Sequence, residues 1–278
     1  SYREILRRYQ DGTDAEDLRQ RISPFLMRRL KKEVLTELPD KIESVFTAQM
    51  SPEQAKVYEA TMMRLRQRVD SIVKEKGFER GRTEVLAAIT QLREICCHPS
   101  LVLDDYTGTS GKLDMLLDML PEAIAKGRRV LLFSAFTSML KILRRELDDA
   151  GYETMYLDGD TPAQRRVEMA EQFNAGQGQI FLISLKAGGT GLNLTGADMV
   201  IHYDPWWNPA AEDQATDRAY RIGQTRKVEV IRLVTHASIE EQVVALGQRK
   251  IALFDQLIKP GDSMVGGLSP QEIMSLFQ

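Results

Sequence analysis

The feature that most constrains the fold is an alternation of short apolar, β-rich segments with helical segments from about residue 128 onward. The strand-like segments span 130–133, 154–157, 179–184, 199–203 and 228–234, and the helical ones span 139–147, 162–173, 209–222 and 238–258. Strands that alternate with helices imply βαβ units, right-handed crossovers and a parallel sheet. We therefore expect a three-layer α/β domain whose chemistry lies in loops at the carboxyl ends of the strands.

The residues before 110 have a different pattern. Apolar residues recur there at helical spacing, over 57–73 and 85–95, with no convincing strand between them. Ser51-Pro52-Glu53-Gln54 predicts a helix start with an N-cap, a proline in the first turn and a capping-box glutamine. The stretch 76–81 predicts a break into two helices. We expect the N-terminal third to be a helical appendage.

Composition limits the class of protein. The 278 residues carry a net charge of −3, which argues against a protein that coats nucleic acid by bulk attraction, so any DNA site must be a local groove. No apolar run approaches the roughly 20 residues that cross a bilayer, and no signal peptide is visible, so we expect an intracellular protein without a membrane partner. The chain begins without Met inside a helical pattern, which suggests a fragment of a longer polypeptide.

The cysteine pattern favours no metal site. Cys96 and Cys97 are adjacent and precede His98, but a zinc site needs four spaced ligands, and the other histidines, His202 and His236, are scattered. We expect buried thiols near a helix end and no bound metal.

Two glycine-containing segments invite nucleotide readings. The turn 185–194, Leu-Lys-Ala-Gly-Gly-Thr-Gly-Leu-Asn-Leu, follows a strand and would let backbone amides approach a phosphate or sugar. It departs from the dinucleotide fingerprint because Leu194 stands where the third glycine is needed. Gly111-Lys112 fails as a P-loop, because the spacing is wrong and Leu113 replaces Ser or Thr. The apparatus that grips the phosphates of ATP is therefore absent from this sequence.

The most specific segment is 213–225, Asp-Gln-Ala-Thr-Asp-Arg-Ala-Tyr-Arg-Ile-Gly-Gln-Thr. Residues three apart share a helix face, so we expect Arg218 and Arg221 to present two guanidinium groups in one direction, with Gln214 one turn earlier. Gly223 would end that helix. An exposed arginine pair is usually only a solvated surface. The neighbouring motifs determine whether it has a functional role.

Several segments, taken in order, resemble the Snf2 family of helicase-like ATPases. The segment Gln-x-x-x-Arg-x-x-Arg-x-Gly-Gln resembles helicase motif VI, the glycine-rich turn resembles motif V, and Val130–Leu140 resembles motif IV, although Ala135 replaces the usual glutamine. Further resemblances lie at Ile22–Val34, Leu38–Lys41, Leu92–Pro99, Tyr203–Pro209 and Leu268–Phe277. Together they cover nearly the whole chain.

This resemblance implies a RecA-like second lobe, of the P-loop NTPase type, with an N-terminal all-helical insertion. It divides the chain into the exit from lobe one and a linker at 1–50, the insertion at 51–110, the lobe at 111–258 and a tail at 259–278. It further implies a DNA-dependent ATPase that translocates on double-stranded DNA and remodels protein–DNA complexes. ATP and Mg²⁺ would be held mainly by a preceding lobe one, so this chain alone would not hydrolyse ATP. The tail is similar to bacterial members, which implies a cytoplasmic, nucleoid-associated protein.

The resemblance also assigns roles to residues. Arg218 and Arg221 would be the catalytic arginines, although the sequence does not say which of them reaches the γ-phosphate. The nucleotide-binding residues would be Gly189, Gly191, Leu192, Gln214 and Asp217. The DNA-binding residues would be Ser134, Thr137, Lys186, Thr190, Trp207 and Asn208, and a core position is an equal alternative for Trp207.

Two other functions stay open. An RNA helicase lobe would share the fold and motif VI, although the segment Trp206-Trp207-Asn208-Pro209 favours the Snf2 family. A non-catalytic scaffold would keep the lobe alone, and the retention of both arginines speaks against it. Besides DNA and lobe one, a DNA-bound protein complex is a possible partner.

Overall fold

The computed structural model of the chain describes residues 38–187, 191–206, 208–257 and 270–277. The chain divides into two units: residues 38–244 with 268–278, and residues 1–37 with 245–267. The first unit contains the sheet, its covering helices and all the loops described below.

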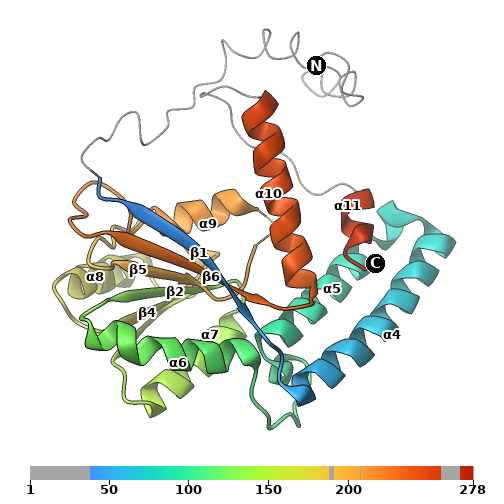
Figure 1. The fold of residues 1–278 in the computed structure, drawn as a ribbon, viewed down its shortest axis with the longest axis horizontal. Helices are drawn as coiled ribbons and strands as arrows, with labels where there is room; N and C mark the ends of the chain where they lie inside the picture. The colour runs from blue at the N-terminus through green and yellow to red at the C-terminus, as the bar shows by residue number, and fades with distance from the viewer. Residues whose placement is uncertain (1–37, 188–190, 207, 258–269, 278) are drawn as a thin grey trace. The chain divides into compact units, whose positions relative to one another are not determined.

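The sheet of this unit has six strands, every neighbouring pair of which is parallel. They are β1 (Lys41–Ala48), β2 (Val130–Ser134), β3 (Thr154–Leu157), β4 (Ile180–Ser184), β5 (Met199–His202) and β6 (Val228–Thr235). Their order across the sheet is β1-β6-β5-β2-β4-β3 (Figure 1). The expected parallel α/β architecture is confirmed, and the carboxyl ends of all six strands meet at one edge.

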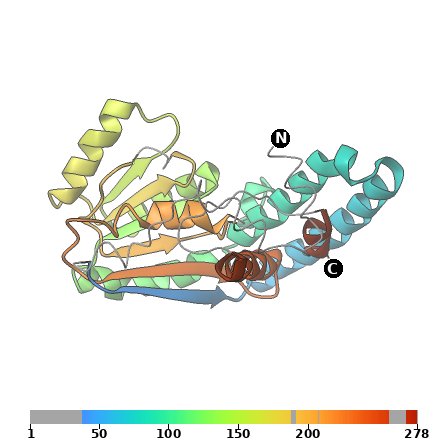
Figure 2. The same cartoon turned by 90° about the horizontal axis from the view of Figure 1, so that it is seen from above.

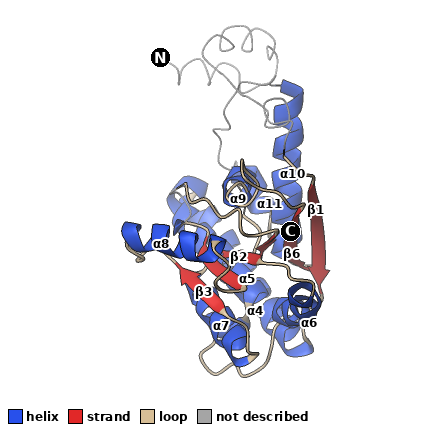
Figure 3. Cartoon of the chain, turned by 90° about the vertical axis from the view of Figure 1, so that its left-hand side faces the viewer, coloured by secondary structure: helices blue, strands red, loops and turns tan. Residues whose placement is uncertain are grey.

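Alternation along the strands builds two cores. Val130 and Leu132 of β2 belong to the core on one face, whereas Leu131 and Phe133 belong to the core on the other. Helices α6 (Gly111–Ala125) and α7 (Thr137–Asp149) cover the first face, and α8 (Ala163–Asn174) and α9 (Pro209–Thr216) cover the second (Figure 3). Each fully buried Leu or Phe contributes about 1.5–3 kcal/mol to folding.

The helical part before residue 110 consists of α4 (Pro52–Lys76), α5 (Phe78–Cys97) and the short 3₁₀ helix η2 (Pro99–Leu101). The long helices α4 and α5 pack side by side (Figures 1 and 2). Gly77 separates them with a φ of 76°, which confirms the predicted break.

The start of α4 confirms part of the predicted helix start. The Ser51 side chain accepts a hydrogen bond from the Gln54 amide at 3.2 Å, as an N-cap should. The Gln54 side chain does not complete the capping box with Ser51. It is fully buried, donates to the carbonyl of Ile95 at 2.8 Å and accepts from the Gly111 amide at 3.0 Å. Gln54 therefore joins the start of α4 to the end of α5 and the start of α6.

The expectation of a purely helical N-terminal third is wrong, because residues 41–48 form β1. This strand pairs with β6 along its whole length, from Lys41 opposite Val228 to Ala48 opposite Thr235. Its side chains are mostly exposed, as at Ile42, Val45 and Phe46, since β1 lies at the edge of the sheet. The sheet thus begins well before residue 111.

The start of α6 shows what the Gly111-Lys112 pair does. A Cβ atom at Gly111 would lie 1.7 Å from the Gln49 carbonyl oxygen, so only glycine fits there. Lys112 is buried and forms an ion pair of 2.7 Å with Glu240 in α10 (Ile239–Leu257). Its ammonium group also donates to the Tyr203 carbonyl at 2.9 Å. Lys112 is a structural lysine that joins α6 to the sheet.

The thiols of Cys96 and Cys97 are free and buried at the end of α5, as expected. Burial raises the pKa of the Cys96 thiol well above its ordinary value. The last described segment contains α11 (Pro270–Ser275), followed by the buried residues Leu276 and Phe277.

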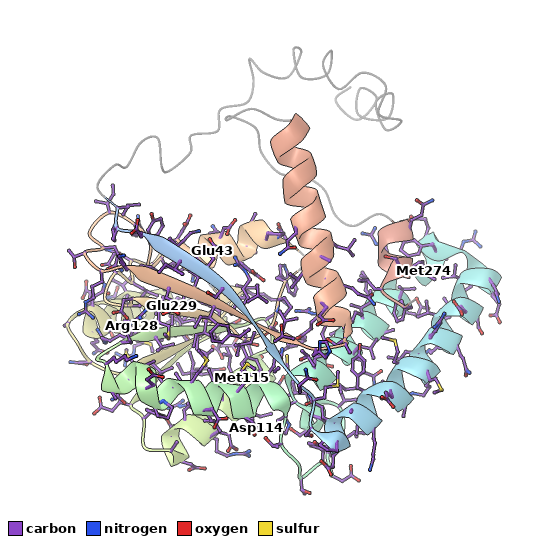
Figure 4. All side chains as sticks on the ribbon, in the orientation of Figure 1. Glu43, Asp114, Met115, Arg128, Glu229 and Met274 are labelled. Atoms are coloured by element: carbon purple, nitrogen blue, oxygen red, sulfur yellow. The ribbon has the colours of Figure 1, made fainter. Side chains whose placement is uncertain are left out.

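The amino edge of the sheet is held by a cluster of ion pairs. Arg128 contacts Asp198 and Glu229, each at 3.1 Å, and Figure 4 labels Arg128 and Glu229 side by side. Arg226 adds a second contact to Asp198, at 3.2 Å. The neighbouring Arg129 donates to the carbonyl oxygens of three residues that follow α8 or end it, namely Phe173, Gln177 and Gly178.

Candidate functional site

Three of the residues expected to contact DNA lie exposed at the carboxyl edge of the sheet. Thr137 is the first residue of α7, Lys186 follows β4, and Asn208 is the residue before α9. The Asn208 side chain makes no capping hydrogen bond to α9. Because parallel strands end at the same edge, these polar groups face solvent on one side of the molecule. Thr190 and Trp207 lie outside the described residues.

Ser134 does not fit its expected role. Its side chain is 1% exposed, and its hydroxyl donates to a carboxylate oxygen of Asp204 at 2.5 Å. The hydroxyl also accepts a hydrogen bond from the Phe136 amide at 3.1 Å. The Ser134 side chain therefore holds the loop between β2 and α7 and does not reach the surface where a DNA backbone would lie.

Arg218 is buried, with 4% of its surface exposed. Its guanidinium group lies 5.7 Å from the centre of the Phe133 ring, near the carboxyl end of β2. The Nη1 atom is buried and has no hydrogen-bond partner among the described residues. Burial lowers the pKa of Arg218 to about 10, so the group is still cationic at neutral pH. A buried cation with a free donor is suited to an anionic ligand.

Arg221 differs from this. It is exposed, and its Nη1 lies 3.4 Å from the Gly191 carbonyl oxygen. Helix α9 ends at Thr216, so the two arginines follow the helix and do not share one of its faces. The expectation of one continuous helix through residue 222 is wrong. The chain turns inward at Ala219, which is fully buried, and this packing outweighs the helical periodicity.

Gln224 explains how this turn is fixed. Its buried side-chain amide donates to the carbonyl oxygens of Ala197 at 2.7 Å and Ala219 at 3.0 Å. The Leu194 amide donates to the Arg218 carbonyl at 2.9 Å. These bonds join the segment after the glycine-rich turn to the segment that carries both arginines, so the two motifs form one rigid surface.

The other residues expected at the nucleotide surround this surface. Gly191 is exposed with a φ of 30°, and Gln214 is exposed on α9. Asp217 is half-buried at the end of α9, while the Leu192 side chain is part of the core. Leu192 could therefore contact a ligand only through its backbone. Gly189 lies outside the described residues.

His202 lies in the same region and contacts Phe133 and Thr216. Its ring stacks on Phe133 with centres 5.6 Å apart, and its Nε2 lies 3.0 Å from the Thr216 hydroxyl. Burial lowers the pKa of His202 to about 3, so the ring is neutral at physiological pH. His202 and Arg218 are thus both placed against Phe133, and the ring adds no second positive charge there.

Sequence reasoning missed Phe133, Asp204 and Gln224, and it missed Arg93 of α5. A weak signal existed for Asp204, because it directly follows β5 at the functional edge of the sheet. A second existed for Arg93, a charged residue inside an apolar helical pattern. Neither signal shows which groups these residues contact.

Within the described ranges there is no cluster of His, Cys, Asp or Glu that could hold a metal ion. The helices described there also include none that is long and apolar enough to cross a membrane.

Two family models match the chain. The helicase conserved C-terminal domain matches residues 111–223, and the SNF2-related domain matches residues 3–101. The first covers α6 through the turn that carries Arg218 and Arg221, and the second ends with the helical pair and η2.

Curated relatives extend over most of the chain. It is 39% identical over 268 residues to a putative ATP-dependent helicase/translocase, YwqA, of Bacillus subtilis, which covers 94% of this chain and 28% of the relative. It is 37% identical over 258 residues to the chromatin structure-remodeling complex subunit snf21 of Schizosaccharomyces pombe, with 86% and 21% covered. The chain therefore spans about a quarter of the length of these relatives.

Solved structures of a Sulfolobus solfataricus SWI2/SNF2 ATPase show the same fold. Its C-terminal domain is 30% identical, with a TM-score of 0.66 and coverage of 85% of this chain and 98% of that one. Its ATPase core in complex with double-stranded DNA is 35% identical, with a TM-score of 0.67 and coverage of 87% and 52%. The parallel sheet is therefore RecA-like, and this chain belongs to the SWI2/SNF2 family.

Proposed function

We propose that the chain is the second motor lobe of a DNA-dependent ATPase that translocates on double-stranded DNA and remodels protein–DNA complexes. The family membership supports the general activity. The arrangement of residues at the carboxyl edge supports the role of this lobe within it.

The observation that carries the proposal is the environment of Arg218. Burying a guanidinium group while one of its donors lacks a partner costs free energy. Such a cost is retained where a ligand supplies the missing acceptor, and an anionic phosphoryl group is a strong acceptor for arginine. During phosphoryl transfer, negative charge spreads over the transferring oxygens, and a fixed cation stabilises that state more than the ground state.

The lobe would supply only part of the ATP site. The sequence lacks a P-loop and the acidic pair that holds Mg²⁺, so the triphosphate and the metal would be bound mainly by a partner RecA-like lobe of the same polypeptide. Arg218 would face the phosphoryl group, because its buried Nη1 has no hydrogen-bond partner among the described residues. Arg221 and Gln214 are exposed and would contact the nucleotide or the facing lobe when the two lobes close.

The exposed residues at the carboxyl edge would contact the DNA backbone. The Thr137 hydroxyl, the Lys186 ammonium group and the Asn208 amide are all suited to phosphate oxygens and carry no base information. Binding should therefore be independent of sequence and should weaken as salt rises. The solved complex of the Sulfolobus relative with double-stranded DNA supports DNA as the partner.

A protein–DNA complex is the proposed target, since one relative is a subunit of a chromatin structure-remodeling complex. A bacterial, nucleoid-associated setting is also proposed, and the relatives include a Bacillus subtilis protein at 39% identity.

The test is the ATPase activity of the full-length protein with duplex DNA, with RNA of the same sequence, and with neither. We expect duplex DNA to raise turnover at least about tenfold and its half-saturating concentration to rise steeply between 50 and 200 mM salt. The 278-residue chain alone should show no turnover above background. Equal stimulation by RNA would indicate an RNA helicase, and a full-length protein without ATPase activity would indicate a scaffold.

A further inference from the structure

The carboxylate of Asp204 lies where three separate segments of the first unit meet. Asp204 follows β5 and is 2% exposed. One oxygen accepts from the Ser134 hydroxyl, both lie 3.2 Å from the Ala135 amide, and one lies 3.2 Å from the Arg93 guanidinium. One buried charge thus joins α5, the loop after β2 and the loop after β5.

Arg93 contacts both of these loops by itself. It is 1% exposed, and its guanidinium donates to the Pro205 carbonyl at 2.8 Å. The guanidinium also lies 5.2 Å from the centre of the Phe136 ring and 5.0 Å from that of the Trp206 ring. One ring belongs to each loop, so a single planar cation holds the two loops at a fixed separation.

The two loops lead directly to residues that we propose to contact DNA. Thr137 follows Phe136 by one position, and Asn208 follows Trp206 by two. A shift of either ring would therefore move a phosphate-binding group. The position of these groups depends in this way on a side chain that comes from the helical pair α4–α5, more than a hundred residues earlier in the chain than Asp204.

We propose that Arg93 is a positioning residue, through which the helical pair holds the loops after β2 and β5 in the shape that binds the DNA backbone. This rests on the proposed function. A purely structural ion pair would need only a positive charge near Asp204. A positioning role needs the planar guanidinium, because only that group can stack between two rings and donate to Pro205 at once.

The test compares Arg93→Met and Arg93→Lys with the wild type in the full-length protein. We measure the duplex DNA concentration that half-saturates ATPase stimulation, the turnover at saturating DNA and the KM for ATP. Both variants should raise the half-saturating DNA concentration by about tenfold, which corresponds to the loss of one charged hydrogen bond and its stacking. Turnover and the KM for ATP should change less than about threefold, because the Arg218 surface does not involve Arg93.

Arg128→Met is the matched control, since Arg128 also has carboxylate partners but lies at the amino edge of the sheet. It should leave the half-saturating DNA concentration unchanged. Phe136→Leu removes one ring and no charge, and it should raise that concentration by about threefold. This variant keeps the test valid if Arg93→Met does not fold.

Two results would overturn the inference while the wild type is stimulated by DNA. They are a half-saturating DNA concentration equal to that of the wild type in Arg93→Lys, or in Phe136→Leu. If Arg93→Met loses turnover only in step with folded protein, Phe136→Leu decides. A wild type that DNA does not stimulate would refute the proposed function and this inference together.

Discussion

The two edges of the sheet each hold a partly or fully buried arginine, and the two arginines are treated in opposite ways. At the amino edge, Arg129 donates to carbonyl oxygens of Phe173, Gln177 and Gly178, and its guanidinium lies 3.9 Å from the centre of the Phe173 ring. At the carboxyl edge, Arg218 is more deeply buried, yet its Nη1 has no partner among the described residues.

We interpret this difference as separating an arginine that stabilises the fold from one that we propose to bind a ligand. When all the N–H donors of a buried arginine have acceptors, these hydrogen bonds offset the free-energy cost of removing the guanidinium from water. A buried donor without a partner does not, and such destabilising groups gather at functional sites. The two residues therefore predict opposite results for the same substitution.

The largest effect is expected for Arg218→Ala in the full-length protein. It should lower DNA-stimulated turnover by at least about a hundredfold, because the transition-state charge loses a fixed cation. ATP binding should weaken much less, and Arg218→Lys should rescue poorly since lysine lacks the planar fork. Steady-state ATPase assays at saturating duplex DNA, paired with a nucleotide titration, measure both quantities. Near-wild-type turnover would show that Arg218 is a structural residue like Arg129.

A smaller effect of the opposite kind is expected for Arg129→Ala. It should lower the free energy of unfolding by about 2 kcal/mol, because three carbonyl oxygens lose a charged donor. Turnover at saturating DNA should stay within about threefold of the wild type. Denaturant unfolding of the 278-residue chain measures the first quantity, and Arg218→Ala in the same assay should cost less. A more destabilised Arg218→Ala would break the comparison.

The smallest effect concerns His202, which stacks on Phe133, the same ring that the Arg218 guanidinium faces. Its folded-state pKa of about 3 lies below the ordinary value of 6.5, so between these values the unfolded state binds a proton that the folded state does not. Its contribution is complete above about pH 6.5 and is lost as the pH falls toward 3. Between pH 7.5 and 5.5 the wild type should therefore lose on the order of 1 kcal/mol more stability than His202→Gln.

Chemical denaturation of the two proteins at both pH values makes this measurement. Other titrating groups are common to both chains and cancel in the difference. Equal losses in the two proteins would mean that His202 is protonated in the folded state, which would contradict the buried, neutral ring described for the site.

The inner strands β2, β4 and β5 could be predicted because they are buried at every position and are therefore mostly apolar in sequence. The edge strand β1 could not. Its side chains are mostly exposed, its apolar residues are mixed with charged ones, and its partner β6 begins at Val228, far along the chain. The local sequence pattern of β1 does not indicate that it pairs with so distant a strand.

The candidate site was predictable as a set of segments and not as a geometry. The motifs placed Arg218 and Arg221 together, but their three-residue spacing suggested equal exposure. Which of them is buried depends on Phe133, from a strand some eighty residues earlier. Ser134 was assigned to DNA for a related reason. Its hydroxyl is buried by its bond to Asp204, and the sequence does not show that these two residues are neighbours.

The pairing of β1 with β6 has a mechanical consequence. The two strands are parallel and in register from Lys41 to Ala48, so a force applied to Lys41 along the strand axis would slide β1 past β6. Such a load acts in shear and stretches all the rungs of the ladder at once, whereas a load across the strands would break them singly. In the motor that we propose, a force along this strand would therefore act on the ladder in its more resistant direction.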